Sequence, residues 1–420
     1  MNVTTLGECR VRSPLSGFVS DEERIPEFIR RRPGQPFDEG VLFELAGPRE
    51  RLFFDPTKTR AGIVTCGGLC PGLNNVIRSL FLQLRYGYGV PEVLGFRMGY
   101  RGLDPHRGPE PFVLTHRMVD DIHQHGGTLL GTSRGPVDIG IAVEYLIRRG
   151  VDMLFCIGGD GTQRGAYALY EACRQRGHAL SVVGVPKTID NDVRYVTRTF
   201  GYLTALDESR RVIDAAHTEA CSVQNGVALV KLMGRHAGFI AAGATVASQD
   251  VNFTLIPEVP FALGGPTGFL AALKRRVLER GHAVVVVAEG AGQDLFAGSP
   301  EARDASGNVR LRDIGPFLSE GITTFFANER VPVTLRYFDP SYQIRSRPAN
   351  CEDAVMCDQF ARQAVHAALA GKTGLVVGFL HGAFIHVPTD LIVSGVKQVE
   401  PDGPLWQAVL ATTGQPPRFE

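Results

Sequence analysis

The sequence predicts an α/β protein built from two doubly wound, mostly parallel sheets, and three observations lead to this prediction. From about residue 61, short apolar runs of strand length alternate with longer amphipathic runs, which is the pattern of parallel sheets covered by helices on both faces. Glycine-rich loops join several of these runs. The chain has 420 residues, enough for two or three domains of roughly 150 residues, so two sheets fit the length better than one.

Residues 1–58 differ from the rest of the chain. They contain several prolines and two charge runs, Asp21–Arg24 and Arg30–Arg32, with little hydrophobic periodicity. We expect an extension packed on the surface, with a short helix near Glu22–Arg31. The basic triplet is most simply a solvated face.

The regular elements follow in order from residue 61. Apolar runs predict strands at Ala61–Thr65, Val151–Ile157, Leu180–Val185, Gly226–Leu232, Ala283–Ala288 and Gly374–Phe379. Longer runs predict helices at Leu73–Leu84, Thr162–Cys173, Tyr202–His217, Ala237–Ala247, Gly268–Arg280 and Ala354–Ala370.

The composition limits the classes of partner. Lys plus Arg and Asp plus Glu both total 44, and this balance gives no reason to expect nucleic acid or a membrane surface as partner. No apolar run approaches the roughly 18 to 20 residues that a membrane span needs, and the N-terminus lacks the pattern of a secretory signal. The eight cysteines form no CxxC pair, so we expect reduced thiols in a cytoplasmic protein.

The first candidate site is the glycine-rich loop Thr65–Asn75, with the sequence TCGGLCPGLNN. It leaves a predicted strand and enters a predicted helix, where free backbone N–H groups and the helix dipole favour a phosphate. The loop has no GxxxxGK[ST] pattern, so it is not a Walker loop. Taken alone, it is equally compatible with a tight turn that binds nothing.

The second candidate site is Ile157–Thr162, with the sequence IGGDGT, again between a strand and a helix. A carboxylate at a phosphate-binding loop repels the ligand unless a divalent cation bridges the two. Asp160 is therefore a candidate magnesium ligand, direct or through water. The segment occurs in more than one class of kinase, so it indicates a phosphoryl donor site and leaves the acceptor open.

The third candidate site, Val185–Asp192, has the sequence VPKTIDND and follows a predicted strand. In phosphoryl transfer to an alcohol, one carboxylate accepts the hydroxyl proton while cations and amides neutralise the transferring group. Asp190 and Asp192 can divide the roles of base and metal-side partner.

Six motifs, taken together and in order, resemble those of the 6-phosphofructokinase superfamily. They are GGLCPGLN at 67–74, LLGTSRG at 129–135, GGDGT at 158–162, PKTIDND at 186–192, KLMGRHAG at 231–238 and YFDPSYQIRSRPAN at 337–350. The resemblance runs from about residue 61 to residue 382. The N-terminal extension and the wording of the first and last motifs resemble the longer plant and trypanosomatid ATP-dependent branch.

The resemblance implies an enzyme that uses ATP and magnesium to phosphorylate the 1-hydroxyl of fructose 6-phosphate in glycolysis. It implies that Asp190 is the general base and that Asp160 is the metal ligand. Beside Asp190, the implied catalytic residues are Lys187, Thr188 and Asp192. The implied ATP-binding residues are Gly67, Gly68, Arg134, Gly135, Gly159, Asp160, Gly161 and Thr162. The implied fructose 6-phosphate residues are Thr188, Asp190, Met233, Gly234, Arg235, Glu289, Tyr342 and Arg345.

The resemblance also implies a phosphofructokinase-like fold with the active site in the cleft between two domains. We expect the donor domain at 59–200, completed by about 337–372. The fructose 6-phosphate domain is expected at 201–336, completed by about 373–420. The family usually forms homo-oligomers, dimers or tetramers, so we expect one here.

Two positions depart from the short bacterial members of the family. Those enzymes supply a substrate-phosphate arginine across a subunit interface, nine positions before the arginine of the MGR motif, and that position is Gly226 here. The intersubunit contact is therefore replaced or lost. Their loop also reads PGTIDND, whereas this chain has Lys187, as pyrophosphate-dependent relatives do.

Gly161 and Lys187 bear on the donor in opposite directions. In pyrophosphate-using relatives the residue after the GGD aspartate is usually Asp, whose side chain fills space that a nucleotide α-phosphate needs. Gly161 leaves that space open. Lys187 suits pyrophosphate, but it suits ATP phosphates nearly as well. Because steric exclusion decides more firmly than a compatible charge, the sequence favours ATP.

Three alternatives remain open. The first is a pyrophosphate-dependent fructose 6-phosphate 1-phosphotransferase. The second is a catalytically silent regulatory subunit, which should have lost the proton acceptor, yet Asp190 and Asp160 are both present. The third is a lipid or NAD kinase, which can share GGDGT but has no reason to carry PKTIDND followed by MGR.

Overall fold

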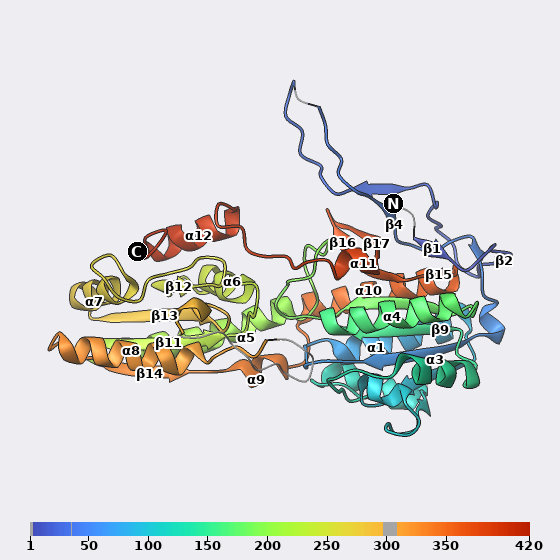
Figure 1. Cartoon of the computed structure of the whole chain (residues 1–420), viewed down its shortest axis with the longest axis horizontal. Helices are drawn as coiled ribbons and strands as arrows, with labels where there is room; N and C mark the ends of the chain where they lie inside the picture. Colours follow the sequence, from blue (N-terminus) through green and yellow to red (C-terminus); the bar gives the residue numbers. More distant parts are fainter. Residues whose placement is uncertain (1–2, 35, 297–308) are drawn as a thin grey trace. The chain divides into compact units, whose positions relative to one another are not determined.

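The computed structural model describes residues 3–34, 36–296 and 309–420, and the chain divides into two compact units (Figure 1). Unit 1 contains residues 1–188, 193–201 and 346–396. Unit 2 contains residues 189–192, 202–345 and 397–420. Two α/β units are in line with the predicted fold class.

Unit 1 is built on a nine-stranded mixed sheet. In spatial order its strands are β3 (Arg24–Pro26), β4 (Leu42–Leu45), β17 (Ala383–Pro388), β16 (Leu375–Leu380), β10 (Ser181–Pro186), β9 (Met153–Gly158), β6 (Arg60–Thr65), β7 (Glu92–Phe96) and β8 (Phe112–Val113). The five strands from β16 to β7 are parallel, and both edges are antiparallel. Two small ladders pair β1 (Thr4–Thr5) with β15 (Lys372–Thr373) and β2 (Val11–Arg12) with β5 (Arg51–Leu52).

Helices cover both faces of the parallel part of this sheet. The helices of unit 1 are α1 (Leu73–Leu82), α2 (His116–Val119), α3 (Ile139–Arg148), α4 (Asp160–Gln175), α10 (Cys351–Leu369) and α11 (Thr389–Ile392), with short 3-10 or π turns η1 (Pro56–Lys58), η2 (Gln83–Tyr88), η3 (Gly99–Leu103) and η4 (Ile122–Gln124). One buried cluster joins β6, β9 and β10 to α3 and α4. Helices α1 and α10 pack against each other, and α10 contacts β10 and β9. Burial on both faces explains why these strands are continuous apolar runs.

Unit 2 contains a four-stranded sheet in which every pair is parallel. In spatial order its strands are β12 (Phe253–Leu255), β13 (His282–Ala288), β11 (Gly226–Leu232) and β14 (Thr334–Phe338). The helices of unit 2 are α5 (Tyr202–Cys221), α6 (Phe239–Ser248), α7 (Phe269–Arg280), α8 (Ile314–Asn328), α9 (Ser341–Arg345) and α12 (Pro404–Thr413), with the 3-10 turn η5 (Gln293–Leu295). A buried cluster joins alternate residues of β11 and β13 to α7 and α8.

The N-terminal residues are more integrated into unit 1 than the sequence indicated. The expected short helix near Glu22–Arg31 is wrong, because the chain forms strand β3 there and Pro26 disfavours a helix interior. The expectation of a purely surface extension is also wrong. Strand β4 pairs with β17, and Phe43 within it is fully buried.

A buried ionic cluster anchors β4. The Glu44 carboxylate pairs with Arg49 at 2.8 Å and with Lys372 at 2.7 Å. It also lies 2.9 Å from Nδ1 of His386, which donates to it. Burial alone would raise the pKa of Glu44, but the hydrogen bonds and charges of His386 and Lys372 outweigh it and lower the pKa to about 2.

The return segments of the two units differ from the expected boundaries. Residues 373–396, expected with the second domain, lie in unit 1 because β16 and β17 extend the large sheet beside β10. Residues 337–345, expected with the first domain, lie in unit 2 because β14 pairs with β11.

Most of the expected strands and helices are present with small shifts at their ends. The sequence analysis missed several others, including β7, α3, α8, β14 and β17. Within the described residues, no helix has both the length and the apolar character needed to cross a lipid bilayer.

Candidate functional site

Three loops of unit 1 leave neighbouring parallel strands. β10, β9 and β6 lie side by side, and Gly158 at the end of β9 is in register with Pro186 at the end of β10. Because the carboxyl ends of parallel strands meet at one edge, the glycine loop 66–72, the turn Gly159–Thr162 and Lys187 share that edge. Open α/β sheets bind their ligands at this edge.

Lys187 connects the glycine loop to the neighbouring strands. Its Nζ donates to the carbonyl of Gly68 at 2.8 Å, and its backbone N–H donates to the carbonyl of Gly158 at 3.0 Å. The residue is only 7% exposed. The fold therefore holds this cation at the edge where the sequence predicted the donor phosphates.

The LLGTSRG motif packs beside the same glycine loop. The Thr132 hydroxyl donates to the carbonyl of Gly67 at 2.7 Å, and the N–H of Gly67 donates to the carbonyl of Ser133 at 3.2 Å. The next residues are Arg134, which is exposed, and Gly135, which is half-buried. Arg134 and Gly135 thus lie near Gly67 although some 65 residues separate them in sequence.

The second loop leads directly into a helix, as the sequence predicted. α4 begins at Asp160, so the glycine turn places an exposed carboxylate at a helix N-terminus, where anions are favoured. This carboxylate pairs with Arg164 at 3.0 Å. A Cβ on Gly158 would lie 2.1 Å from the Thr162 hydroxyl oxygen, so glycine is required for the helix to begin this close to the strand.

The space beside Gly161 is open. A Cβ added to this residue would meet no heavy atom within 4 Å, and the residue is exposed. A longer side chain would therefore extend into accessible space at the sheet edge that carries the glycine loops, and not into the protein.

Thr188, Asp190 and Asp192 follow β10 on one continuous segment, and residues 189–192 belong to unit 2. The Thr199 hydroxyl donates to the carbonyl of Thr188 at 2.8 Å. Both aspartates are half-buried. Carboxylates in this setting are partly shielded from water and partly accessible.

Lys397 forms two hydrogen bonds to the segment that carries these aspartates. Its Nζ donates to Oδ1 of Asn191 at 3.0 Å, and its backbone N–H donates to the carbonyl of Asp192 at 2.7 Å. Burial lowers the pKa of the Lys397 ammonium to about 7, although the Asp192 carboxylate opposes this shift. Nothing in the local sequence around Lys397 indicated this role, because its partners lie about 200 positions away.

In unit 2, a second group of predicted residues follows the ends of parallel strands. Leu232 and Ala288 are in register at the ends of β11 and β13. Met233–Arg235 continue from β11 and Glu289 continues from β13, and the N–H of Glu289 donates to the carbonyl of Leu232 at 2.9 Å. Asp339 follows β14 beside them.

The charged groups at this edge surround Glu289. Burial raises the pKa of the Glu289 carboxyl, and the charges of Arg235 and Lys231 oppose that shift. Arg345 opposes it more weakly. The structure therefore places Arg235, Glu289 and Arg345 in one charged region of unit 2.

The remaining predicted residues of this group differ in exposure. The Arg345 guanidinium stacks 4.6 Å from the ring centre of Tyr342, and Tyr342 is 75% exposed. Met233 is half-buried, whereas Gly234 is buried with a φ of 130° that favours glycine. Arg235 donates from Nη2 to the backbone oxygen of Val309.

Sequence reasoning assigned no role to Lys231, which lies next to this region. Its Nζ pairs with Asp313 and with Asp339, each at 2.8 Å. These two carboxylates raise its pKa against the effect of burial. A lysine in the otherwise apolar strand β11 is the signal that would have found it, because strands buried on both faces rarely carry an unpaired charge.

The glycine at position 226 has a local structural cause. Gly226 begins β11 and is buried, and a Cβ there would lie 2.1 Å from the carbonyl oxygen of Ala220. An arginine side chain has no room at this position without a backbone shift.

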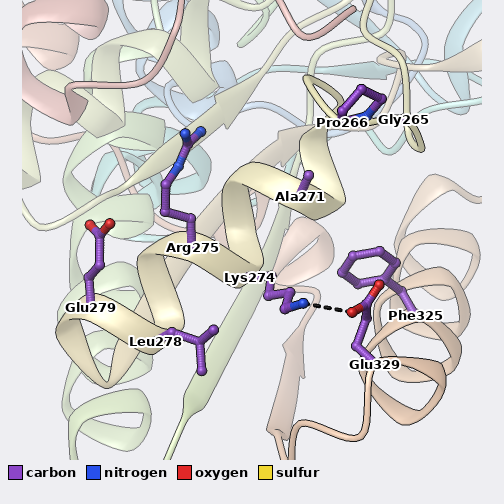
Figure 2. Close-up of a pocket in the computed structure, with 9 residues that line it drawn as sticks. All are labelled: Gly265, Pro266, Ala271, Lys274, Arg275, Leu278, Glu279, Phe325 and Glu329. Carbon is purple, nitrogen blue, oxygen red and sulfur yellow. Dashed lines mark hydrogen bonds and ion pairs between the residues drawn. The ribbon is translucent and has the colours of Figure 1, made fainter.

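A pocket of about 660 Å³ lies elsewhere in unit 2, between α7 and α8 (Figure 2). Lys274 and Glu329 form an ion pair of 2.6 Å at its wall. Its lining includes none of the predicted site residues. The site is therefore identified by the strand ends and their charges and not by cavity volume.

Glycine loops at one sheet edge and arginines around a carboxylate at another are features of α/β enzymes that bind phosphorylated small molecules. The Phosphofructokinase family model matches residues 60–368, about three quarters of the chain. The chain belongs to the phosphofructokinase family, which confirms the resemblance seen in the six motifs.

Similar proteins agree with this family. A protein of Amycolatopsis methanolica named ATP-dependent 6-phosphofructokinase is 46% identical over 100% of this chain and 95% of its own length. One of Trypanosoma brucei brucei with the same name is 47% identical over 89% of this chain and 76% of its own. The solved pyrophosphate-dependent phosphofructokinase of Marinobacter aquaeolei matches with a TM-score of 0.70 at 20% identity, over 84% of this chain and 91% of that chain. At this identity the last match supports the fold alone.

Proposed function

We propose that this chain transfers the γ-phosphoryl group of ATP to the 1-hydroxyl of fructose 6-phosphate, giving fructose 1,6-bisphosphate and ADP in glycolysis. The observation that carries the proposal is the segment Lys187–Asp192. This segment leaves the end of β10 and carries a buried lysine, which contacts the glycine loop after β6 at Gly68, and two half-buried carboxylates. The names of the relatives at 46% and 47% identity support the same reaction.

In this proposal unit 1 binds the donor. The N-terminus of α4, the Gly67–Gly68 loop and Arg134 receive the ATP phosphates. Asp160 would hold magnesium, directly or through water, and its exposed carboxylate at a helix N-terminus fits a cation that prefers oxygen ligands. When bound, the ion neutralises charge on the donor phosphates.

Unit 2 binds the acceptor in this proposal. Arg235 and Arg345 suit the phosphate of fructose 6-phosphate, because guanidinium groups fork onto phosphate oxygens. Glu289 accepts hydrogen bonds from sugar hydroxyls. Asp190 accepts the proton of the 1-hydroxyl as the new O–P bond forms, and Asp192 is its partner on the metal side.

We propose ATP over pyrophosphate as donor. The open space at Gly161 leaves room for a nucleotide α-phosphate, and Lys187 serves either donor. A homo-oligomer, dimer or tetramer, in the cytoplasm is the expected state of the enzyme. The absence of a CxxC pair among the eight cysteines suits a reducing compartment.

Initial rates on purified protein test this function. Fructose 1,6-bisphosphate formation is measured with ATP and with pyrophosphate at matched magnesium, with Asp190→Ser as a control for contaminating activity. We expect turnover with ATP that exceeds turnover with pyrophosphate and that the control lacks. Equal or faster turnover with pyrophosphate would overturn the donor, and no turnover with either donor would overturn the function.

A further inference from the structure

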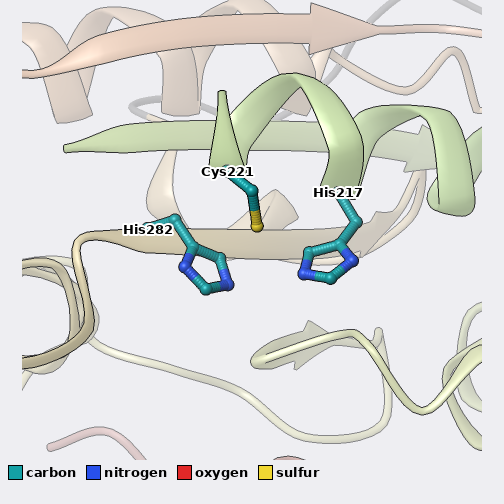
Figure 3. Close-up of side chains that lie close together, drawn as sticks. All are labelled: His217, Cys221 and His282. Carbon is teal, nitrogen blue, oxygen red and sulfur yellow. The ribbon is translucent and has the colours of Figure 1, made fainter. Parts of the chain in front are cut away.

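Two histidines and one cysteine of unit 2 gather at a place that the proposed reaction does not use (Figure 3). His217, Cys221 and His282 each offer a ligand atom, and these atoms lie within 4.8 Å of one another. Figure 3 shows the Cys221 sulfur between the two imidazole rings, whose centres are 5.3 Å apart. His217 and His282 are half-buried and Cys221 is exposed, so an ion from solvent can reach the cluster.

The elements that carry these residues hold them in place. His217 and Cys221 are four positions apart in the last turns of α5, so both side chains point from one face of the helix. His282 begins β13, where it is in register with Gly226 at the start of β11. α5 packs against both strands, which brings its C-terminal turns to the amino end of the sheet.

The cluster lies far from the charged region around Glu289. His282 and Glu289 stand at opposite ends of β13, seven residues apart, which corresponds to roughly 20 Å along a strand. Binding at the cluster is therefore separate from binding of the proposed substrates.

Neighbouring groups orient the two imidazoles as ligands. Nδ1 of His282 lies 3.3 Å from the carbonyl oxygen of Arg280, and Nδ1 of His217 lies 3.6 Å from a carboxylate oxygen of Asp250. A metal-binding histidine commonly donates its other ring N–H to a backbone carbonyl or a carboxylate. The same arrangement here directs Nε2 of each ring toward the cluster.

The charges around the cluster are balanced. Asp250 and Arg276 both act electrostatically on Cys221, and Arg276 also donates to the carbonyl of His282 at 3.3 Å. The two charges act in opposite directions on the Cys221 thiol, and the Asp250 carboxylate also contacts His217. Two imidazoles and a thiolate form a donor set that carries one negative charge.

We propose that His217, Cys221 and His282 bind one borderline-soft divalent cation of the Zn²⁺ class, with Asp250 as the group that orients His217. Thiolate and imidazole are ligands of such ions, whereas Mg²⁺ takes oxygen ligands. Bonds of about 2.0–2.3 Å in a tetrahedral site hold ligand atoms roughly 3.3–3.8 Å apart. The ligand atoms of the cluster lie within 4.8 Å of one another. Side-chain rotations that bring these atoms about 1 Å closer together would give the tetrahedral separation. The bound ion would clamp the end of α5 to the start of β13.

Titration of the full-length, chelator-treated protein with Co²⁺ tests the proposal. We expect one ion per chain with a thiolate-to-cobalt charge-transfer band and the absorption of tetrahedral Co²⁺. Zn²⁺ should displace the ion and excess Mg²⁺ should not. Cys221→Ser should abolish the charge-transfer band, and His282→Gln should weaken binding by about tenfold or more. Cys351→Ser, at an exposed cysteine outside the cluster, is the matched control and should bind like the parent.

Asp250→Asn and thermal melting complete the test. Asp250→Asn should keep the charge-transfer band and weaken binding by about 10 to 100-fold. Zn²⁺ should raise the melting temperature of the parent and of Cys351→Ser, but not that of Cys221→Ser. The proposal is overturned if no thiolate band forms, if the band survives Cys221→Ser, or if all variants bind Co²⁺ with equal affinity, as adventitious surface binding would.

Discussion

Replacing Gly161 with Asp tests the proposed donor at a single residue. A Cβ at this position meets nothing within 4 Å, and the residue lies in the first turn of α4. A negative side chain is favourable there because of the helix dipole, by about 0.3–1 kcal/mol. The substitution should therefore leave folding intact, so a loss of activity will report on the site.

The expected loss follows from like charges at the donor edge. The new carboxylate stands next to Asp160 and faces the space proposed for the α-phosphate. Two unit charges about 6 Å apart repel by about 2.8 kcal/mol at an effective permittivity of about 20. Since about 1.4 kcal/mol corresponds to tenfold in rate, kcat/KM for ATP should fall by about a hundredfold. Pyrophosphate, which is smaller, should show a smaller fall or a gain.

The assay measures initial rates of fructose 1,6-bisphosphate formation with each donor, together with the melting temperature of each variant. Gly161→Asn is the matched control, because its side chain has nearly the size of Asp without the charge. We expect Gly161→Asn to retain more activity with ATP than Gly161→Asp. The two variants thus separate the contribution of charge from that of volume.

Two results would refute this reasoning. If Gly161→Asp keeps kcat/KM for ATP within about threefold of the parent, which is about 0.7 kcal/mol, the residue does not face the nucleotide phosphates. If the melting temperature of Gly161→Asp falls sharply, the space beside Gly161 does not accommodate a larger side chain, and the loss of activity no longer reports on the site alone. In the first case other residues decide the donor.

Three further predictions concern catalysis and stability. Asp190→Ser should lower turnover by about 10² to 10⁴ with nearly unchanged binding of fructose 6-phosphate, and steady-state kinetics showing near-normal turnover would remove Asp190 from the mechanism. Glu44→Gln should destabilise unit 1 by about 3 kcal/mol, because it leaves the buried cations of Arg49 and Lys372 to share the single carboxylate of Asp21. The pKa of Glu44 is lowered from 4.5 to about 2 on folding, so its stabilisation is present above pH 4.5. In denaturant unfolding, the difference in midpoint between the parent and Glu44→Gln should become smaller as the pH falls from 4.5 toward 2. Lys397→Met should lower kcat by about tenfold, because the hydrogen bond to Asn191 is lost, with little change in the KM for ATP. Because folding lowers the pKa of Lys397 from 10.5 to about 7, the parent should gain stability as the pH rises across that range. Lys397→Met should not gain stability over this pH range. If the stability of the parent and of Lys397→Met depends on pH in the same way, the prediction is wrong.

The sequence by itself determined the elements whose signals are local. The run Gly226–Leu232 predicted a strand with the bounds that the structure has, because a parallel strand buried on both faces is a continuous apolar run. The loops after β6 and β9 were located by glycines between a predicted strand and a predicted helix, and the loop after β10 by Asp190 and Asp192, which follow a predicted strand. The order of the six motifs then pointed to the family that the comparison establishes.

Only the tertiary structure decided the contacts that join distant parts of the chain. The sequence placed the N-terminal residues outside the fold, whereas β4 joins the large sheet and Glu44 pairs with Lys372 more than 300 residues later. Lys397 reaches Asn191 in the same manner. Local propensity carries no information about such pairs, because their stabilisation comes from burial and charge that exist only after the strands have paired. The His217, Cys221 and His282 cluster likewise exists only because α5 packs on β13.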